Sequence, residues 1–410
     1  MTCHLHRIAF ALITICALTA PAVAAQPLTE GESLRLGLAL PELAALARGR
    51  IGVAEADALE AGLWANPTLE FLRDSARSGD NAQEDSVLLS QPVDISGRRS
   101  LKREAGEQRV SAASADVRAL VNERAGEIRR NFYQLLLHEQ RLAAIETWAG
   151  RFADTERVVG KLRAAGEASG YDLRRLVRER QTAEAKRAET QAERDGAREQ
   201  LAALIGTEVK AWNGVAGRLL PGTPPDIKTL LSRLEDRPDL AALAARAAAA
   251  DLDGRAADRG WLPEVTLGVG ARRTDLGSTR ITAGLISVSV PLPVFDRQQA
   301  GAGRAAAQAM GVRAEYRLAR ARAEGQLRGT RLQALQLIAA AERYRREALA
   351  PSAELVRIAE SAYRAGEFTV LELLDAYRGA LDAEITALEL EAKARLARIE
   401  LDLLTGSHAE

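Results

Sequence analysis

The chain has few residues that could cross-link it. Only two cysteines, Cys3 and Cys16, occur among its 410 residues. Both lie in an N-terminal segment where Arg7 precedes the apolar run Ile8 to Ala20, which small residues follow. This pattern is typical of a cleaved export signal, and the run is shorter than the ~20 residues of a membrane-spanning helix. We therefore expect residues 1–25 to be a signal peptide and the mature chain to form no disulfide.

Soft metal ligands are also scarce, because the chain has 4 histidines and 2 methionines. Outside the signal, the histidines are His138 and His408. Since zinc and copper sites need clusters of such ligands, we expect no metal site and no cofactor. Neither sign of charge is in excess: Lys plus Arg equals Asp plus Glu at 56 each. This balance excludes the basic field that a nucleic-acid partner requires.

The sequence contains no recognisable catalytic set. No nucleophile stands with a base, and no phosphate loop follows a strand. Glu372 and Asp375 form a carboxylate pair that acid–base chemistry could use. Their alanine-rich surroundings carry no sign of a pocket. We therefore expect that the protein is not an enzyme.

The chain repeats itself over a long distance. Several short matches recur in the same order, and the unit is longer than a solenoid repeat of ~20 to 50 residues. The matches are Pro41 to Ala47 with Pro238 to Ala244, Trp64 and Pro67 with Trp261 and Pro263, and Ala165-Gly166-Glu167 with Ala365-Gly366-Glu367. We infer an internal duplication, with a first repeat at 26–206, an inter-repeat segment at 207–227, a second repeat at 228–405 and a tail at 406–410.

Each repeat has the same expected order: a helical segment, a β-hairpin, a long helix, a glycine break and another helix. The initial helical segments are expected at 31–62 and 228–260. Apolar residues alternate with Thr and Gly from Val265 to Ala271, which predicts a strand. The other expected strands are 281–294, 68–72 and 87–91, and the expected turns are 272–279 and 74–85.

Two very long helices are expected, at 98–163 and 297–364. The first contains no proline, and its apolar residues recur at alternating steps of three and four, as in Val110, Ala113, Val117 and Leu120. This period predicts coiled-coil packing. At 1.5 Å per residue the first helix would reach roughly 100 Å.

Four strands cannot cross a membrane alone, since an open sheet leaves backbone groups unpaired in hydrocarbon. Closure must therefore come from several copies. Trp64 and Trp261 both precede an expected strand, where amphipathic rings favour a membrane interface. The alternative, that each ring caps a helix against its neighbour, stays open.

With these features in place, the mature sequence resembles the TolC family of outer membrane factors along nearly its whole length. The residues that carry the resemblance are Leu63 to Leu69, Gln91-Pro92, Gly97-Arg98-Arg99, Arg237 to Leu240, Val288 to Arg297 and Tyr363 to Ala376. The combination of Gln91-Pro92 with Gly97-Arg98-Arg99 is most similar to the cobalt-zinc-cadmium resistance branch.

The resemblance implies a mostly α fold with a β-barrel portion. Three chains would form a homotrimer with a twelve-stranded barrel among the lipids of a Gram-negative outer membrane. Antiparallel coiled-coil helices would continue it as a periplasmic tunnel, with 207–227 in an equatorial belt. The implied function is a passive exit duct of a tripartite efflux system, with heavy-metal cations as one cargo class. Its partners would be a periplasmic adaptor and an inner-membrane pump of the RND or another type.

The resemblance also assigns site residues. Gly166, Glu167, Gly366 and Glu367 would form the adaptor-contacting tips, where glycine permits the left-handed turn that ends a helix.

Glu372, Asp375, Asp172 and Tyr363 would form the pore gate. The first two share a helix face, so threefold symmetry would gather six carboxylates and favour cations. A solvated helix face is the alternative. Phe368 departs from the family pattern, because a basic residue that helps the gate to close stands there in the best-known member.

Other functions remain open at this point. An exported coiled-coil protein that spaces the envelope without a pore is the rival from another class, and the alternating run from Val265 to Ala271 argues against it. The duct of a drug-efflux or type I protein-secretion system is the alternative within transport.

Overall fold

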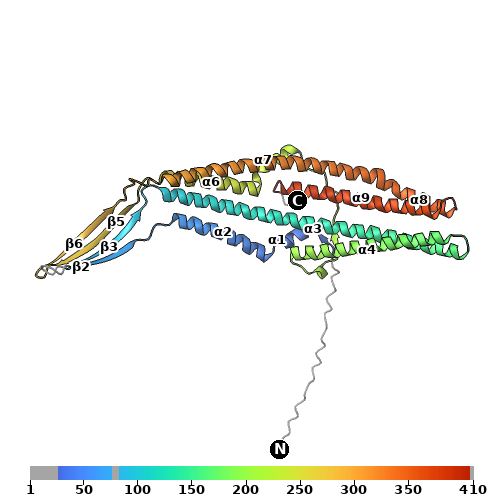
Figure 1. The fold of residues 1–410 in the computed structure, drawn as a ribbon, viewed down its shortest axis with the longest axis horizontal. Coiled ribbons are helices and arrows are strands. Elements are labelled where there is room, and N and C mark those ends of the chain that lie inside the picture. Colours follow the sequence, from blue (N-terminus) through green and yellow to red (C-terminus); the bar gives the residue numbers. More distant parts are fainter. Residues whose placement is uncertain (1–25, 76–82, 407–410) are drawn as a thin grey trace, which may run out of the picture.

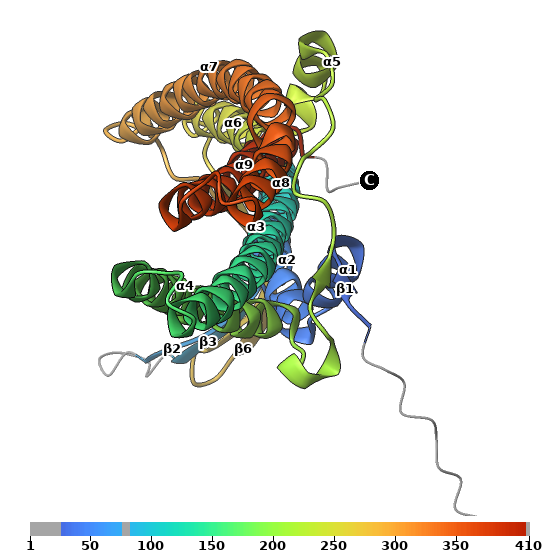
Figure 2. The same cartoon turned by 90° about the vertical axis from the view of Figure 1, so that its right-hand side faces the viewer.

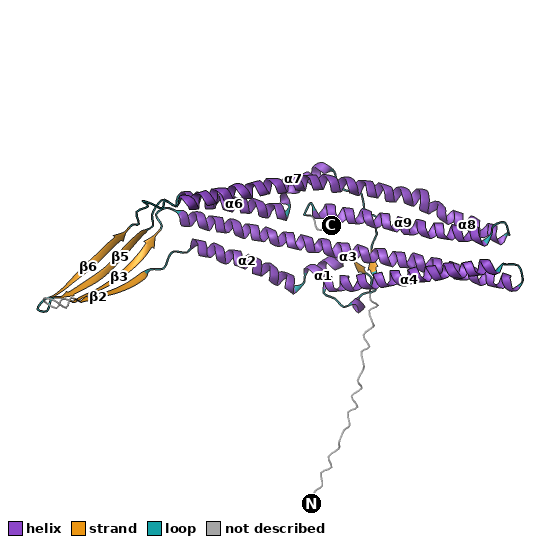
Figure 3. Ribbon diagram, viewed as in Figure 1, coloured by secondary structure: helices purple, strands orange, loops and turns teal. Residues whose placement is uncertain are grey.

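The molecule is elongated, with a β-sheet at one end and long helices running away from it (Figure 1). The computed structural model describes residues 26–75 and 83–406. The expected signal peptide and residues 407–410 of the tail, with His408, lie outside the described residues. Figure 3 separates the two regions by secondary structure. Among the described residues, no helix combines the length and the apolarity that crossing a bilayer requires.

The first repeat contains two short and two long helices. The initial helical segment is divided, because Pro41 starts a new helix after Ala39 and Leu40. The elements are β1 (Leu28–Thr29), α1 (Glu30–Leu38), α2 (Pro41–Gly62), α3 (Arg98–Ala164) and α4 (Gly170–Ile205). The long helix predicted at 98–163 is thus confirmed as α3.

The second part of the chain follows a similar order. The helix expected at 228–260 is also divided, since a short 3-10 turn (Leu234–Asp236) and Pro238 separate α5 from α6. The elements are η1 (Val209–Ala211), β4 (Val215–Ala216), α5 (Ile227–Ser232), α6 (Pro238–Asp258), α7 (Gln299–Tyr344), α8 (Ala350–Arg364) and α9 (Val370–Leu403). The division into repeats with the stated boundaries stays a prediction.

The second long helix is not a regular α-helix along its length. A π-helical turn at Arg345–Leu349 separates α7 from α8. Pro351 explains its position, because proline has no backbone N–H to donate to the carbonyl of Glu347, four residues earlier. A π turn is one of the ways in which a helix accommodates such a break.

The four-stranded sheet has the order β2-β3-β5-β6, and all its neighbours are antiparallel. Its strands are β2 (Thr68–Ser75), β3 (Gln83–Val93), β5 (Val265–Asp275) and β6 (Arg280–Ser289). They exist where the alternation predicts them. β2, β3 and β5 extend further into the predicted turn regions than expected, and β6 ends at Ser289 rather than at 294.

The helices pack in a curved layer, seen along the long axis in Figure 2. α3 is the centre of this layer and packs against α2, α4, α6 and α9. Its buried residues include Ile128, Phe132 and Leu135, which contact the apolar sides of the neighbouring helices. The end of α3 pairs with α4 as a first helical hairpin, and α8 pairs with α9 as a second.

A buried arginine joins the two ends of the chain to α3. The guanidinium of Arg129 contacts Glu30 of α1 at 2.6 Å and Asp402 of α9 at 3.0 Å. Tyr133, one turn along α3, donates its hydroxyl to Glu30 as well. Burial and the neighbouring Glu30 raise the pKa of Tyr133, so the hydroxyl keeps its proton. These contacts connect both α1 and α9 to one residue of α3.

We predict that Arg129→Met destabilises the protein. The change leaves the carboxylates of Glu30 and Asp402 without their buried cation, which costs about 3 kcal/mol. Thermal unfolding followed by circular dichroism should give a clearly lower melting temperature. Arg118→Met, an exposed position on the same helix, is the control and should melt like the wild type. Equal melting of the two variants would contradict a stabilising role for Arg129.

Candidate functional site

One face of the sheet is apolar. Cross-strand neighbours form rows on this face, and the rows are Leu69–Leu89–Val269–Ile286 and Phe71–Val87–Ala271–Gly284, with Gln91–Leu267–Val288 nearer the helices. The large apolar side chains in them are exposed, and Ile286 is 87% exposed. A soluble protein rarely exposes so large a patch. We call this surface the apolar face; it has the character of a lipid-contacting surface.

The opposite face carries mostly small and polar side chains, although four large apolar ones also lie on it, Leu72, Leu88, Ile281 and Leu285. Thr68, Ser90, Gly268 and Ser287 form one row, and Glu70 and Arg272 lie further along. We call this surface the polar face. The alternation of apolar and polar faces along each strand is the pattern of a strand with lipid on one side and water on the other.

Both the sheet and the helical layer have open edges. β2 and β6 each pair on one side within the described chain. In the helical layer α2 packs on α3, α3 on α6 and α6 on α7, so α2 and α7 lie at the margins. Both margins expose apolar residues, such as Leu59 on α2 and Leu318 on α7. The sheet and the helices are therefore open on the same two sides.

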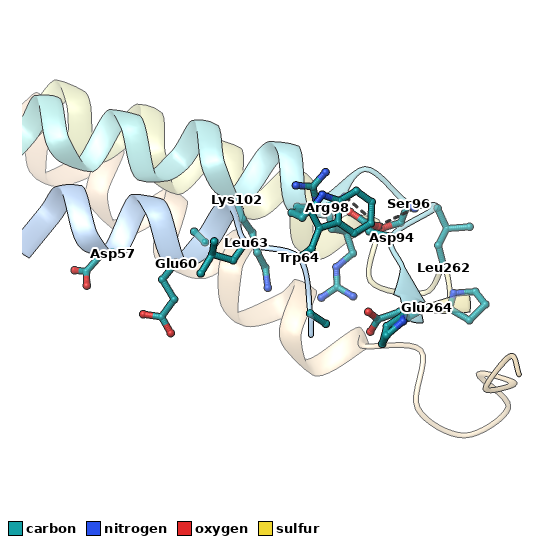
Figure 4. Close-up of a pocket in the computed structure, with 15 residues that line it drawn as sticks. Asp57, Glu60, Leu63, Trp64, Asp94, Ser96, Arg98, Lys102, Leu262 and Glu264 are labelled. Atoms are coloured by element: carbon teal, nitrogen blue, oxygen red, sulfur yellow. Dashed lines mark hydrogen bonds between the residues drawn. The ribbon is translucent and has the colours of Figure 1, made fainter. Parts of the chain in front are cut away.

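The two predicted interface tryptophans lie at the junction between sheet and helices, and both rings are about half exposed, at 51% for Trp64 and 56% for Trp261. The guanidinium of Arg99 stacks on the ring of Trp64 at 3.9 Å. Trp64 also borders a cavity of about 560 Å³ (Figure 4). If Trp64 caps a helix against its neighbour, packing of this kind is expected. The role of both tryptophans at a membrane interface stays a prediction.

The cavity beside Trp64 is lined by charges of both signs. Its charged residues are Glu60 of α2, Glu264 just before β5, and Arg98 and Lys102 of α3. Asp94 is already engaged, since it accepts hydrogen bonds from Ser96 and from the backbone N–H of Arg99 in the first turn of α3. These bonds hold the pKa of Asp94 below its usual value despite the opposing effect of burial.

The two predicted tip turns have the same backbone geometry. Gly166 and Gly366 have φ values of 82° and 76°. The N–H groups of Glu167 and Glu367 donate to the carbonyls of Leu162 and Ala362, at 2.8 and 2.9 Å. This is the Schellman pattern that ends a helix with a left-handed glycine. The predicted chain reversal at each glycine is confirmed, whereas adaptor contact at the tips stays a prediction.

The predicted gate residues lie at the start of the returning helices. Glu372 and Asp375 are both exposed on α9. Glu372 closes a capping box with Thr369, whose backbone N–H donates to its carboxylate at 2.7 Å. Hydrogen bonds from Thr369 lower the pKa of Glu372 below its usual value. Glu372 therefore has a structural role besides the one predicted from the sequence.

Asp172 and Tyr363 lie on the two different hairpins near the tips. Ser169 donates its hydroxyl to Asp172 at 2.6 Å and caps α4. Burial raises the pKa of Tyr363, and the negative charge of Asp172 raises it further. The structure thus brings the two predicted partners near each other, each from one hairpin.

The structure also shows a pair that the sequence does not signal. Arg378 of α9 binds Glu179 of α4, with its Nε 2.7 Å from the carboxylate, and Glu179 is only 8% exposed in its side chain. The positive charges of Arg378 and Arg178 lower the pKa of Glu179, against the effect of burial. Tyr377, next to Arg378, packs on Trp148 and Phe152 of α3. This cluster joins the two hairpins just above the tips.

Metal ligands are not gathered anywhere in the described part of the chain. His138 is buried on α3, with Nδ1 3.2 Å from the carboxylate of Glu193. Burial lowers the pKa of His138, although Glu193 opposes the shift. A single imidazole beside one carboxylate is a helix-packing contact and supplies too few ligands for zinc or copper.

Comparisons with known proteins agree with this geometry. The family described as "Outer membrane efflux protein" matches residues 230–407. The chain is 27% identical over 394 residues to the cobalt-zinc-cadmium resistance protein CzcC of Cupriavidus metallidurans, and the match covers 94% of this chain and 92% of that protein. It is 26% identical to the nickel-cobalt-cadmium resistance protein NccC of Alcaligenes xylosoxydans xylosoxydans, over 65% of this chain and 61% of the relative.

Solved structures share the fold. The outer membrane protein VceC of Vibrio cholerae superposes with a TM-score of 0.77 at 18% identity, covering 92% of this chain and 96% of that one. A membrane protein from Pseudomonas aeruginosa gives 0.78 at 20% identity, covering 93% and 91%. CusC gives 0.76 at 18% identity, covering 92% and 91%. The mostly helical fold with a small β portion that is expected from the sequence is thereby confirmed.

We predict that Gly366→Ala destabilises the second hairpin. A Cβ at φ 76° is strained by about 1 kcal/mol, although the space around the residue is open. Gly379→Ala is the matched control, because Gly379 lies inside α9, also in open space, where alanine favours the helix. Thermal unfolding should shift in opposite directions for the two variants. A shift in the same direction for both would refute the role of the left-handed turn.

Proposed function

We propose that the chain is an outer membrane efflux protein of the cobalt-zinc-cadmium resistance branch and that it serves as the outer-membrane channel subunit of a tripartite efflux system. The observation that carries the proposal is the sheet with an apolar and a polar face whose open edges lie on the same sides as those of the helical layer. Such a sheet and helical layer would form a closed barrel and tunnel when their open edges pair with those of further copies. The apolar face then meets lipid and the polar face lines a water-filled passage.

Closure requires further copies of the chain. β6 of one copy would pair with β2 of the next, and α7 would pack against the neighbouring α2. Both steps satisfy groups that the single chain leaves open, namely strand-edge backbone groups and exposed apolar side chains. Three copies supply twelve strands, so the proposed assembly is a homotrimer in the outer membrane of a Gram-negative bacterium.

The helical end is proposed to reach into the periplasm and to meet the other two components there. The tip turns at Gly166-Glu167 and Gly366-Glu367 are exposed and lie at the end of the molecule remote from the sheet (Figure 1). We propose that they contact a periplasmic adaptor, which connects the duct to an inner-membrane pump of the RND or another type. The duct itself is passive and has no enzymatic activity.

Heavy-metal cations are the proposed cargo. CzcC and NccC are by name resistance proteins for cobalt, zinc, cadmium and nickel. The described part of this chain gathers no metal ligands. We therefore propose that the cations pass hydrated and are attracted by carboxylates without being coordinated. A coiled-coil spacer without a pore is disfavoured, because such a protein has no use for an exposed apolar sheet face.

The gate is proposed to lie where the hairpins meet. Glu372 and Asp375 of three copies would form an acidic ring at the mouth. Within each copy, the Arg378–Glu179 pair would hold the second hairpin against the first. In the best-known family member a basic residue at the position of Phe368 helps to close the gate. We propose that Arg378, through its buried pair with Glu179, supplies the basic side chain in this protein.

We predict that the protein extracts from outer membranes as a trimer in detergent. The physical reason is that four strands leave two unpaired edges, which only further copies can close. Chemical cross-linking and size measurement in detergent should give three chains. A water-soluble monomer or dimer without any detergent requirement would eliminate the channel and favour the spacer.

We predict that Glu372→Gln with Asp375→Asn weakens the selectivity of the trimer for cations over anions. The ring loses six charges, whereas folding is preserved because glutamine can still close the capping box with Thr369. Wild-type current in planar bilayers should also fall with millimolar divalent ions, and the current of the double variant should not. Glu189→Gln, an exposed acid on α4, is the control. Unchanged selectivity and unchanged divalent block in the double variant would place the pair outside the pore.

A further inference from the structure

The apolar face ends in charged residues on the side remote from the helices. The row beyond Phe71 and Ala271 is Arg73–Asp85–Arg273–Thr282, and the next row is Ser75–Gln83–Asp275–Arg280. With the helices in the periplasm, the hairpin end of the sheet (Figure 3) faces the outside of the cell. These rows therefore lie at the outer boundary of the hydrocarbon, a placement that rests on the proposed function.

The charges in these rows do not balance. Arg73 binds Asp85 through both guanidinium nitrogens, at 2.6 and 3.0 Å. Arg280 binds Asp275 at 3.1 and 3.3 Å. Each aspartate thus has an arginine of its own, and the fifth charged residue in the two rows is Arg273.

Arg273 is exposed and lies between the two pairs. It is the cross-strand neighbour of Asp85 and precedes Asp275 by two residues on the same face. Among the described residues it forms no ion pair within 4 Å, and its charge acts at longer range on Asp85 and Asp275, each of which already binds another arginine. It gives the two rows an excess of one positive charge per chain. A guanidinium that lies at the edge of an apolar surface and that no carboxylate binds directly favours an anionic group attached to apolar chains.

We propose that Arg273, flanked by Arg73 and Arg280, binds a phosphate group of an outer-leaflet lipid whose acyl chains cover the apolar face. Successive rows on one face are about 7 Å apart along the strand. A lipid phosphate at the row of Arg273 therefore directs its chains onto Phe71, Val87 and Ile286. Arg73 and Arg280 keep their aspartates and add donors from either side. A free phosphate ion would gain the charge contact without the apolar one.

The neighbouring residue Arg272 provides an internal control. It precedes Arg273 in β5 and therefore points to the polar face, where it pairs with Glu84 at 2.8 Å. Both arginines sit in the same strand and carry the same charge. Only Arg273 lies on the side that contacts lipid.

The test measures lipid binding to the full-length trimer in detergent. Delipidated trimer is titrated with diphosphorylated lipid A, with its dephosphorylated form and with inorganic phosphate, and bound lipid is counted by native mass spectrometry. Arg273→Gln should weaken diphosphorylated lipid A binding about fivefold, the effect of one basic residue at a charged membrane surface. Arg273→Lys should retain most of the affinity, and Arg272→Gln should bind like the wild type.

Several results would overturn the proposal. These are wild-type affinity in Arg273→Gln, an equal loss in Arg272→Gln, and equal binding of the dephosphorylated lipid. If inorganic phosphate binds with the same affinity as diphosphorylated lipid A, the site recognises an anion without its acyl chains. If trimers associate through the apolar face, that face is a protein contact. Failure of the proposed channel function would be visible earlier, as the absence of a detergent-extracted trimer.

Discussion

Backbone hydrogen bonding at the edges of β2 and β6 is the constraint on which the rest of this structure depends. A strand edge inside a bilayer finds no water, so each N–H and C=O group there must meet another strand. The four-stranded sheet of the described chain leaves two edges open, at β2 and β6. Its sheet can therefore sit in a membrane only as part of a ring, and in the proposed trimer the helices attached to the strands would lie around the same axis. The margins at α2 and α7 are open on the same two sides as the sheet.

Much of this architecture could be predicted from local patterns. In α3 the apolar residues recur every three or four positions, and in β5 they recur every second position. Each spacing indicates that one side of the element has the same surroundings along its length. The ends of β2 and β3 were harder to predict. Arg73 and Asp85 interrupt the apolar alternation and read as a polar loop, yet they pair across the strands and extend the ladder. The π turn before α8 was also missed, because a proline in a long alanine-rich helix does not indicate how its neighbours adjust.

Contacts between distant parts of the chain were beyond sequence reasoning. Arg378 and Glu179 are 199 positions apart, and each sits in a helix rich in other charges. Nothing in either helix marks one arginine as a partner and the others as solvated. The same holds for Arg129, which binds carboxylates from both ends of the chain. The residues of the tips were easier to find, since a left-handed glycine is a local requirement that any one chain shows by itself.

Glu372 illustrates how one side chain can serve both the helix and the proposed pore. Its carboxylate accepts from Thr369, and these bonds favour the charged form and lower its pKa. Because the pKa of Glu372 is lower in the folded protein than in the unfolded chain, its carboxylate stabilises the fold fully at pH values above the unfolded-state pKa. This stabilisation is lost as the pH falls through the folded-state pKa. In a ring of like charges, repulsion acts in the opposite sense and favours protonation of some members. The hydrogen bonds between Thr369 and Glu372 therefore oppose the protonation that repulsion between the carboxylates of the proposed ring would cause. An acidic ring built on capped helix N-termini can keep its attraction for cations under conditions in which a ring of uncapped carboxylates would already be partly neutral.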